Sequence, residues 1–133
     1  MRYLLDTDTC VFALRGVETV RNHFSAVDPG AVAVSVVTLA ELRYGASCSP
    51  RPEANHRVVD DFISGILILG VDTEIARLFG EFKAKLRGRG TLIDDFDLLI
   101  AAAAERYGLT LVTHNLEHFH RIDGLQVEDW TSP

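Results

Sequence analysis

Short apolar runs alternate with segments of helical period along the whole chain, and this alternation restricts the fold more than any other feature. The predicted strands are Tyr3–Leu5, Ala31–Ser35, Ile66–Leu69, Leu109–Thr113 and a short last strand over Gln126–Glu128. Strands that alternate with helices usually lie parallel, because a helix supplies the crossover that a parallel pair needs. The sequence therefore predicts an α/β fold with a mostly parallel sheet of four to five strands flanked by helices.

The intervals between the strands carry the helical patterns. The predicted helices are Thr9–Arg15, Val17–Val27, Val36–Ala46, Glu53–Ser64, Thr73–Arg87 and Asp95–Tyr107. The last helix stops before Gly108, a residue type that readily adopts the left-handed conformation that closes a helix. No repeat, linker or low-complexity tract interrupts the 133 residues, so we expect residues 1–133 to form a single domain.

Composition excludes several classes of protein. Hydrophobic residues make up 47% and charged residues 24% of the chain, a balance typical of globular domains. No apolar run reaches the roughly 18 residues of a membrane helix, and Asp6 comes too early for a secretory signal, so we expect a cytoplasmic protein without membrane association. Cys10 and Cys48 form no metal-binding or disulfide pattern, and we interpret both as small apolar side chains within helices.

Asp97 lies on the apolar stripe of its predicted helix. Ile100, Ala101 and Ala104 follow it at i+3, i+4 and i+7, which directs the Asp97 carboxylate toward the core. A buried carboxylate is unfavourable unless a cation or a metal ion accompanies it. The alternative is a structural acid in the first helical turn, which caps the helix together with Asp94.

Glu41 shows the same anomaly. Val37 precedes it and Tyr44 follows it on one helix face, so this acid also lies on a largely apolar stripe. A buried ion pair would be the structural explanation, but Arg43 is a poor partner because residues i and i+2 on a helix do not face each other. We favour a metal-binding role for Glu41.

Asp6 ends the first predicted strand. A cap of the following helix would be its structural role, but Asp8 stands closer to the expected start of that helix at Thr9. We therefore predict that Asp8 is the cap and that Asp6 is available for chemistry.

These acids are predicted to converge, because strand carboxyl ends and the following helices meet at one edge of an open α/β sheet. Asp6 and Thr113 end strands there, and Asn115 follows directly. Three carboxylates at one point would repel one another unless a hard divalent cation lay between them. Oxygen ligands select Mg²⁺, with Mn²⁺ as a substitute. We predict that Asp6, Glu41 and Asp97 ligate a metal that activates water to hydrolyse a phosphodiester bond.

A basic run lies within an otherwise acidic chain. The net charge is −6, but the segment from residue 77 to residue 89 holds five basic residues and one acid. A solvated helix face is the ordinary explanation of such a run. Next to a nuclease site it would instead hold the RNA backbone, with Lys85, Arg87 and Arg89 as the RNA-binding candidates.

Five segments form an ordered pattern over nearly the whole chain. They are Leu5-Asp6-Thr7-Asp8, Glu41-Leu42-Arg43-Tyr44-Gly45, Asp97-Leu98-Leu99-Ile100-Ala101-Ala102, Thr113-His114-Asn115 with His118-Phe119, and Gly124-Leu125 with Val127-Glu128-Asp129-Trp130. This set resembles the PIN-domain toxins of VapC type, which belong to type II toxin–antitoxin systems.

The resemblance implies a PIN-like three-layer fold and an Mg²⁺- or Mn²⁺-dependent endoribonuclease. Asp6 and Asp97 would be the principal metal ligands, Glu41 the third acid, and Thr113 a hydroxyl that hydrogen-bonds near Asp6. Many PIN domains carry Asp at the position of Asn115, so Asn115 is a candidate for an outer-shell or second-metal role. The resemblance also implies a structured RNA substrate such as tRNA, a small cognate antitoxin and a homodimer.

Asp94 is a second candidate for the outer-shell or second-metal role, although a helix N-cap is its more direct role. His114, His118 and His120 lack a carboxylate or thiolate that would complete a zinc site, and we interpret them as surface or RNA-contacting residues.

Two other functions remain open from the sequence. The segment Asp6-Thr7-Asp8-Thr9 resembles the start of haloacid-dehalogenase-type phosphatases, in which the first Asp is the nucleophile, but Cys10 departs from that pattern. A non-catalytic module that captures an Arg-rich peptide with its acids is the other alternative. Metal-dependent RNA cleavage distinguishes the nuclease from both.

Overall fold

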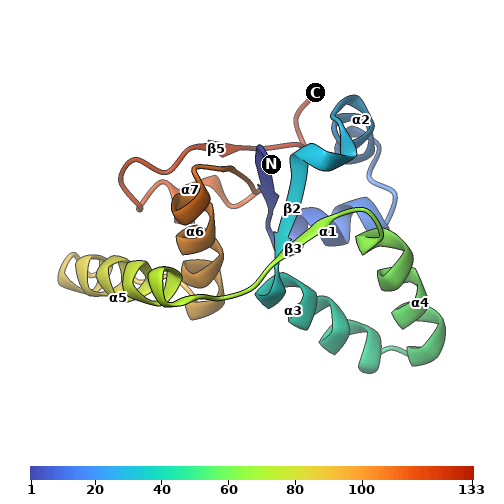
Figure 1. Cartoon of the computed structure of the whole chain (residues 1–133), viewed down its shortest axis with the longest axis horizontal. Coiled ribbons are helices and arrows are strands. Elements are labelled where there is room, and N and C mark those ends of the chain that lie inside the picture. The colour runs from blue at the N-terminus through green and yellow to red at the C-terminus, as the bar shows by residue number, and fades with distance from the viewer.

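A parallel five-stranded sheet forms the centre of the computed structural model, which describes residues 1–133 (Figure 1). The strands are β1 (Tyr3–Leu5), β2 (Val32–Ser35), β3 (Leu67–Leu69), β4 (Thr110–Val112) and β5 (Val127–Glu128). Their order is β3-β2-β1-β4-β5, and every neighbouring pair is parallel. The central strand β1 is apolar and buried at each position because helices cover both faces of the sheet.

Helices form the two outer layers. They are α1 (Thr7–Leu14), α2 (Glu18–Ala26), α3 (Val36–Ser47), α4 (Pro52–Ile63), α5 (Thr73–Gly88), α6 (Asp95–Tyr107) and α7 (Leu116–Phe119), with a 3₁₀ turn over Pro29–Ala31. The core on one face joins β1 through Leu4 to α5, α6 and α7. The core on the other face joins β1 through Leu5 to α1, α2 and α4. Figure 1 shows α5 and α6 on one side of the sheet and α1, α2 and α4 on the other. The predicted PIN-like three-layer α/β fold is therefore confirmed.

The predicted elements are all present, with small shifts at their ends. Helix α6 has the predicted bounds and ends at Gly108, whose φ of 63° is left-handed. Helix α7 and the 3₁₀ turn were not predicted, because four and three residues are too few to show a helical period. Cys10 is buried as expected, but Cys48 lies beyond the end of α3 and is exposed. None of the helices combines the length and apolarity needed to cross a bilayer.

The sheet register brings the functional positions to one edge. Leu5 of β1 pairs with Val112 of β4, so Asp6 and Thr113, the residues that follow them, leave the sheet side by side. Helix α3 starts from β2 at this carboxyl edge, and it packs against α6.

Candidate active site

Asp6 is the most buried acid of the site, with 3% of its surface exposed. It follows β1 and is the N-cap of α1, where its carboxylate accepts a hydrogen bond of 2.9 Å from the backbone N–H of Thr9. The prediction that Asp8 caps this helix is therefore wrong: α1 begins two residues earlier than expected, and Asp8 lies within its first turn. Burial raises the pKa of Asp6, against hydrogen bonds from Thr113 and Thr9 that favour the carboxylate.

Asp97 lies in the first turn of α6 and is partly buried. Its pKa is raised to about 6, first because burial disfavours the charged form and then because other carboxylates lie near it. Those carboxylates, in decreasing order of effect, belong to Asp94, Asp6, Glu41 and Asp8. The structure thus brings the three predicted acids into electrostatic contact, and no basic side chain compensates Asp97.

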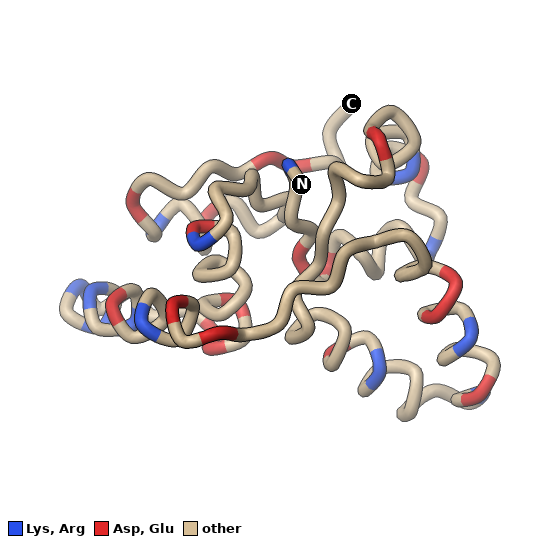
Figure 2. Tube along the Cα trace, viewed as in Figure 1, with Lys and Arg blue, Asp and Glu red and all other residues tan.

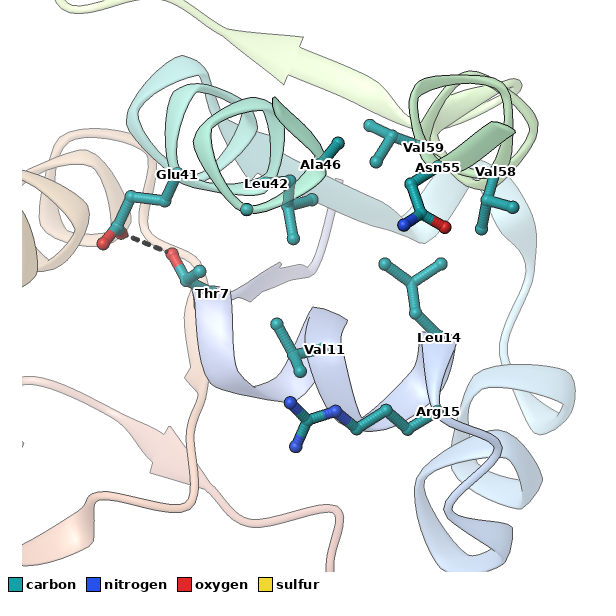
Figure 3. Close-up of a pocket in the computed structure, with 11 residues that line it drawn as sticks. Thr7, Val11, Leu14, Arg15, Glu41, Leu42, Ala46, Asn55, Val58 and Val59 are labelled. Atoms are coloured by element: carbon teal, nitrogen blue, oxygen red, sulfur yellow. Dashed lines mark hydrogen bonds between the residues drawn. The ribbon is translucent and has the colours of Figure 1, made fainter. Parts of the chain in front are cut away.

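Glu41 is partly buried on α3 and is held by a residue that the sequence did not indicate. The Thr7 hydroxyl donates a hydrogen bond of 2.7 Å to Glu41 Oε1 and lies 3.2 Å from the Thr38 hydroxyl (Figure 3). As expected, Arg43 does not pair with Glu41; it pairs with Asp60 at 2.5 Å. Tyr44 is 72% exposed, so the assumed apolar stripe around Glu41 does not extend to it.

The donor atoms fit a hard divalent cation. No group of three His, Cys, Asp or Glu side chains lies close enough together to ligate one ion directly. Mg²⁺ does not need such a group, because it keeps several water molecules and binds through one or two carboxylates. Asp6 and Asp97 are candidates for these carboxylates: burial raises the pKa of both, and the pKa of Asp97 is raised further by the charges of neighbouring acids, Asp6 among them.

The remaining predicted residues of the metal site lie around this pair. Thr113 is buried, and its Oγ1 accepts a hydrogen bond of 2.9 Å from the backbone N–H of Asn115. Asn115 is exposed at the start of α7. Asp94 is the N-cap of α6 and accepts a hydrogen bond of 3.1 Å from the backbone N–H of Phe96, so its predicted role as a helix cap is confirmed.

The basic run follows the second half of α5, where Figure 2 shows its cations gathered toward one end of the molecule. Three of them are in ion pairs: Arg77 with Glu74 and Glu81, Lys83 with Asp95, and Arg89 with Asp123. Lys85 and Arg87 are exposed and have no ion-pair partner. These two cations are therefore the ones most available to a phosphate backbone.

A groove that the sequence did not predict adjoins the acids. It has a volume of about 340 Å³, lies between α1, α3 and α4, and is bounded at one end by Thr7 and Glu41 (Figure 3). Its apolar lining comes from Val11, Leu14, Leu42, Ala46, Val58 and Val59. From helical periodicity alone, these apolar residues would be expected in the core. The sequence did not indicate that they line a groove open to solvent.

Comparisons with known proteins point to one family. A family model described as PIN domain matches residues 3–125. The curated "tRNA(fMet)-specific endonuclease VapC" of Salmonella typhimurium is 40% identical over 131 residues, 98% of both chains. "Ribonuclease VapC2" of Haemophilus influenzae is 39% identical over 131 residues, also 98% of both chains. In the solved structure titled "Crystal structure of DNA bound VapBC from Salmonella typhimurium", a chain matches with a TM-score of 0.92 and 40% identity over 98% of each chain.

A parallel sheet with a carboxylate cluster at its carboxyl edge, together with these relatives, defines a metal-dependent nuclease. The chain belongs to the PIN-domain family, and it matches VapC ribonucleases of toxin–antitoxin systems along nearly its whole length. It is therefore an endoribonuclease of the VapC toxin class. The phosphatase and the non-catalytic module considered above are no longer needed to explain the acids.

Proposed function

We propose that the protein cleaves tRNA by Mg²⁺-dependent hydrolysis, with Mn²⁺ as a substitute, and that it does so in the cytoplasm, where tRNA is found. The observation that carries this proposal is the half-buried Asp97, whose pKa is raised to about 6 by burial and by neighbouring acids. A divalent cation removes that repulsion, and the bound metal supplies an activated water and neutralises the leaving oxygen.

Each residue of the site has a role in this proposal. Asp6 and Asp97 would hold the metal, and the hydrogen bond from the Thr113 hydroxyl favours the ionised form of the Asp6 carboxylate against the effect of burial. Glu41 was predicted as a third ligand, but no three acids lie close enough together to share one ion, so Glu41, fixed by Thr7, would instead hold a water beside the metal. Asn115 and Asp94, both exposed at helix starts, accept or donate hydrogen bonds at the outer shell.

Partners are proposed from the surfaces beside the acids. The apolar groove that ends at Glu41 suits an apolar segment of the antitoxin, which would then lie next to the catalytic acids. A homodimer is supported by exposed apolar side chains along the edge strand β3 and the start of α3. These are Val36, Leu67 and Val71, which are 39%, 49% and 45% exposed.

The proposed substrate is tested with purified protein and full-length tRNA(fMet), the tRNA in the name of the Salmonella relative. We expect cleavage at one bond with Mg²⁺ or Mn²⁺, none with EDTA, and none after addition of the cognate antitoxin. An elongator tRNA is the matched control for substrate choice. Cleavage of both tRNAs alike would contradict the expected preference for tRNA(fMet), and no metal-dependent cleavage of any RNA would contradict the proposed function.

The RNA-binding surface gives a second test. We expect Lys85→Ala with Arg87→Ala to weaken binding of tRNA and to reduce the slope of log K against log salt by about 0.7 for each lost phosphate contact in a single strand. Arg77→Ala, on the same helix but already paired with two acids, is the control and should leave the slope unchanged. An unchanged slope in the double variant would identify the basic run as an ordinary solvated face.

A further inference from the structure

The imidazole of His114 is held in one orientation at the rim of the acid site. Its Nδ1 lies 3.2 Å from Asp129 Oδ2 and 3.1 Å from Thr131 Oγ1. Its ring packs edge-on against Phe12 of α1, with centroids 5.9 Å apart. The side chain nevertheless remains 60% exposed, and Nε2 has no hydrogen-bond partner within the protein. The ring is therefore fixed at one nitrogen and free to bind at the other.

The sheet places this ring beside the catalytic acids. Leu5 pairs with Val112, so Thr113 leaves the sheet next to Asp6, and His114 is the following residue. Val112 also pairs with Glu128 of β5, and the chain beyond β5 supplies the two partners of the ring. Phe12, against which the ring packs, lies one turn of α1 beyond Asp8.

The hydrogen bonds around Nδ1 decide where the ring carries its proton. Thr131 donates both its backbone N–H and its hydroxyl to Asp129 Oδ1, at 2.8 and 2.6 Å. Because the Thr131 hydroxyl proton is used there, Thr131 Oγ1 can only accept from His114. The other neighbour of Nδ1 is a carboxylate oxygen, which also only accepts. Nδ1 therefore carries the proton, and in the neutral ring Nε2 is a hydrogen-bond acceptor.

Asp129 is well suited to hold this tautomer. Burial opposes its ionisation, but the hydrogen bonds from Thr131 and His114 outweigh burial and lower the pKa of Asp129 below its ordinary value. The carboxylate is thus charged at neutral pH and keeps the Nδ1 proton of His114 directed toward it.

An acceptor at this place suits the one backbone hydrogen-bond donor that RNA has and DNA lacks, the ribose 2′-hydroxyl. Hydrolysis by a metal-activated water proceeds on DNA as well as on RNA, so a preference for RNA requires a contact that DNA cannot make. Phosphate oxygens are themselves acceptors, whereas the ribose 2′-hydroxyl can donate. We propose that His114 Nε2 accepts a hydrogen bond from a 2′-hydroxyl near the cleaved bond and so helps the enzyme to select RNA. This inference rests on the ribonuclease function proposed above.

The inference is tested with synthetic tRNA(fMet) molecules that each carry a single 2′-deoxy nucleotide at a different position near the cleaved bond. For the unmodified protein we expect one position at which the deoxy substitution lowers kcat/KM by roughly three- to tenfold, as the loss of one hydrogen bond does. For His114→Phe, which keeps the contact with Phe12, we expect a similar loss on all-ribose tRNA and no further loss at that position. His120→Phe, the same change at an exposed histidine without a side-chain hydrogen bond, should retain the original pattern.

Other outcomes overturn the inference. If the 2′-deoxy substitutions lower kcat/KM equally in the unmodified protein and in His114→Phe at every position, His114 makes no hydrogen bond to a 2′-hydroxyl. A reduced salt dependence with an unchanged deoxy pattern would make His114 a phosphate contact instead. If the unmodified protein cuts no tRNA(fMet), the proposed substrate fails, and the comparison is made by binding affinity on the inactive Asp97→Asn background. Absence of a deoxy effect on binding would then overturn the inference separately.

The tautomer itself gives a readout that does not depend on cleavage. Long-range ¹H–¹⁵N spectra of the neutral His114 ring should show its proton at Nδ1 and not at Nε2. In Asp129→Asn we expect a mixture of tautomers together with a weaker deoxy penalty, since the acceptor that fixes the ring has changed. A proton on Nε2 in the unmodified protein would contradict the proposal.

Discussion

Asp97→Asn is expected to lower metal-dependent RNA cleavage by more than about a hundredfold without unfolding the protein. The substitution removes one of the two charged metal ligands, and metal stabilisation of the transition state amounts to several kcal/mol. The amide has almost the same size as the carboxylate, and the helix start keeps its cap, because Asp94 rather than Asp97 accepts the N–H of Phe96. The measurement is kcat/KM on tRNA with saturating Mg²⁺, together with circular dichroism of the variant.

Asp95→Asn is the matched control for this experiment. It changes the net charge equally and lies two residues away in the same helical turn, but Asp95 is exposed and pairs only with Lys83 at the surface. We expect nearly full activity from it. Asp6→Asn should behave like Asp97→Asn, and because Asn caps helices as well as Asp does, α1 should persist. Retained cleavage in both Asp6→Asn and Asp97→Asn would remove the proposed metal site.

Mg²⁺ is expected to stabilise the protein against heat, and Asp97→Asn should lose most of that gain. A ligand that binds only the folded state stabilises it by RT ln(1 + [L]/Kd), about 2.7 kcal/mol at a hundredfold excess over Kd. For a chain of this length that corresponds to a rise in Tm of roughly 10 °C. In EDTA, by contrast, Asp97→Asn should melt at the same temperature as the unmodified protein or higher, because the amide relieves the repulsion from Asp94, Asp6 and Glu41. Thermal melts of both proteins in EDTA and in Mg²⁺ provide the measurement.

The pH dependence of these melts follows from the same carboxyl group. The folded-state pKa of Asp97 is about 6, above its ordinary value of 3.8. Between these values the unfolded chain has lost the proton that the folded protein keeps, so the metal-free protein loses stability as pH rises from about 4 to about 6. Metal requires the carboxylate, so stabilisation by Mg²⁺ should instead grow over that range. A variant destabilised in EDTA but still fully stabilised by Mg²⁺ would show that Asp97 is a structural acid and not a ligand.

The order of elements could be predicted from the sequence because each strand is short and uniformly apolar and each helix has a periodic face. The bounds of α1 could not, since they depend on which of two acids caps the helix. Asp8 is nearer to the apolar residues, but the register of β1 with β4 places Asp6 beside Thr113, and with Asp6 held there α1 begins directly after it and takes Asp6 as its cap. Local spacing carries no information about such a contact.

Glu41 and Asp97 could be predicted because a carboxylate stands out on an apolar helix face, and Asp6 because it ends a predicted strand. Thr7, which holds Glu41, gave no such signal: a threonine at a helix start has many ordinary roles. The contacts of His114 could not be predicted either. Its partners Asp129 and Thr131 lie 15 and 17 residues further along the chain, and only the pairing of β4 with β5 brings them close to it. The sequence therefore indicated the acids and, through the family resemblance, Thr113, but it did not indicate Thr7 or the groups that hold His114.

Asp6 is both the cap of α1 and a buried acid of the site. These two roles restrict which inactivating mutations of the gene still give a folded protein. A cell that loses the antitoxin survives if the toxin gene is inactivated, and many substitutions achieve that at the price of an unfolded product. At Asp6 the replacements that spare the fold are the few side chains that can still cap α1, such as Asn or Ser, whereas Asp97 and Glu41 cap nothing. Escape alleles that still produce a folded, antitoxin-binding protein should therefore gather at Asp97 and Glu41 and tolerate little variety at Asp6.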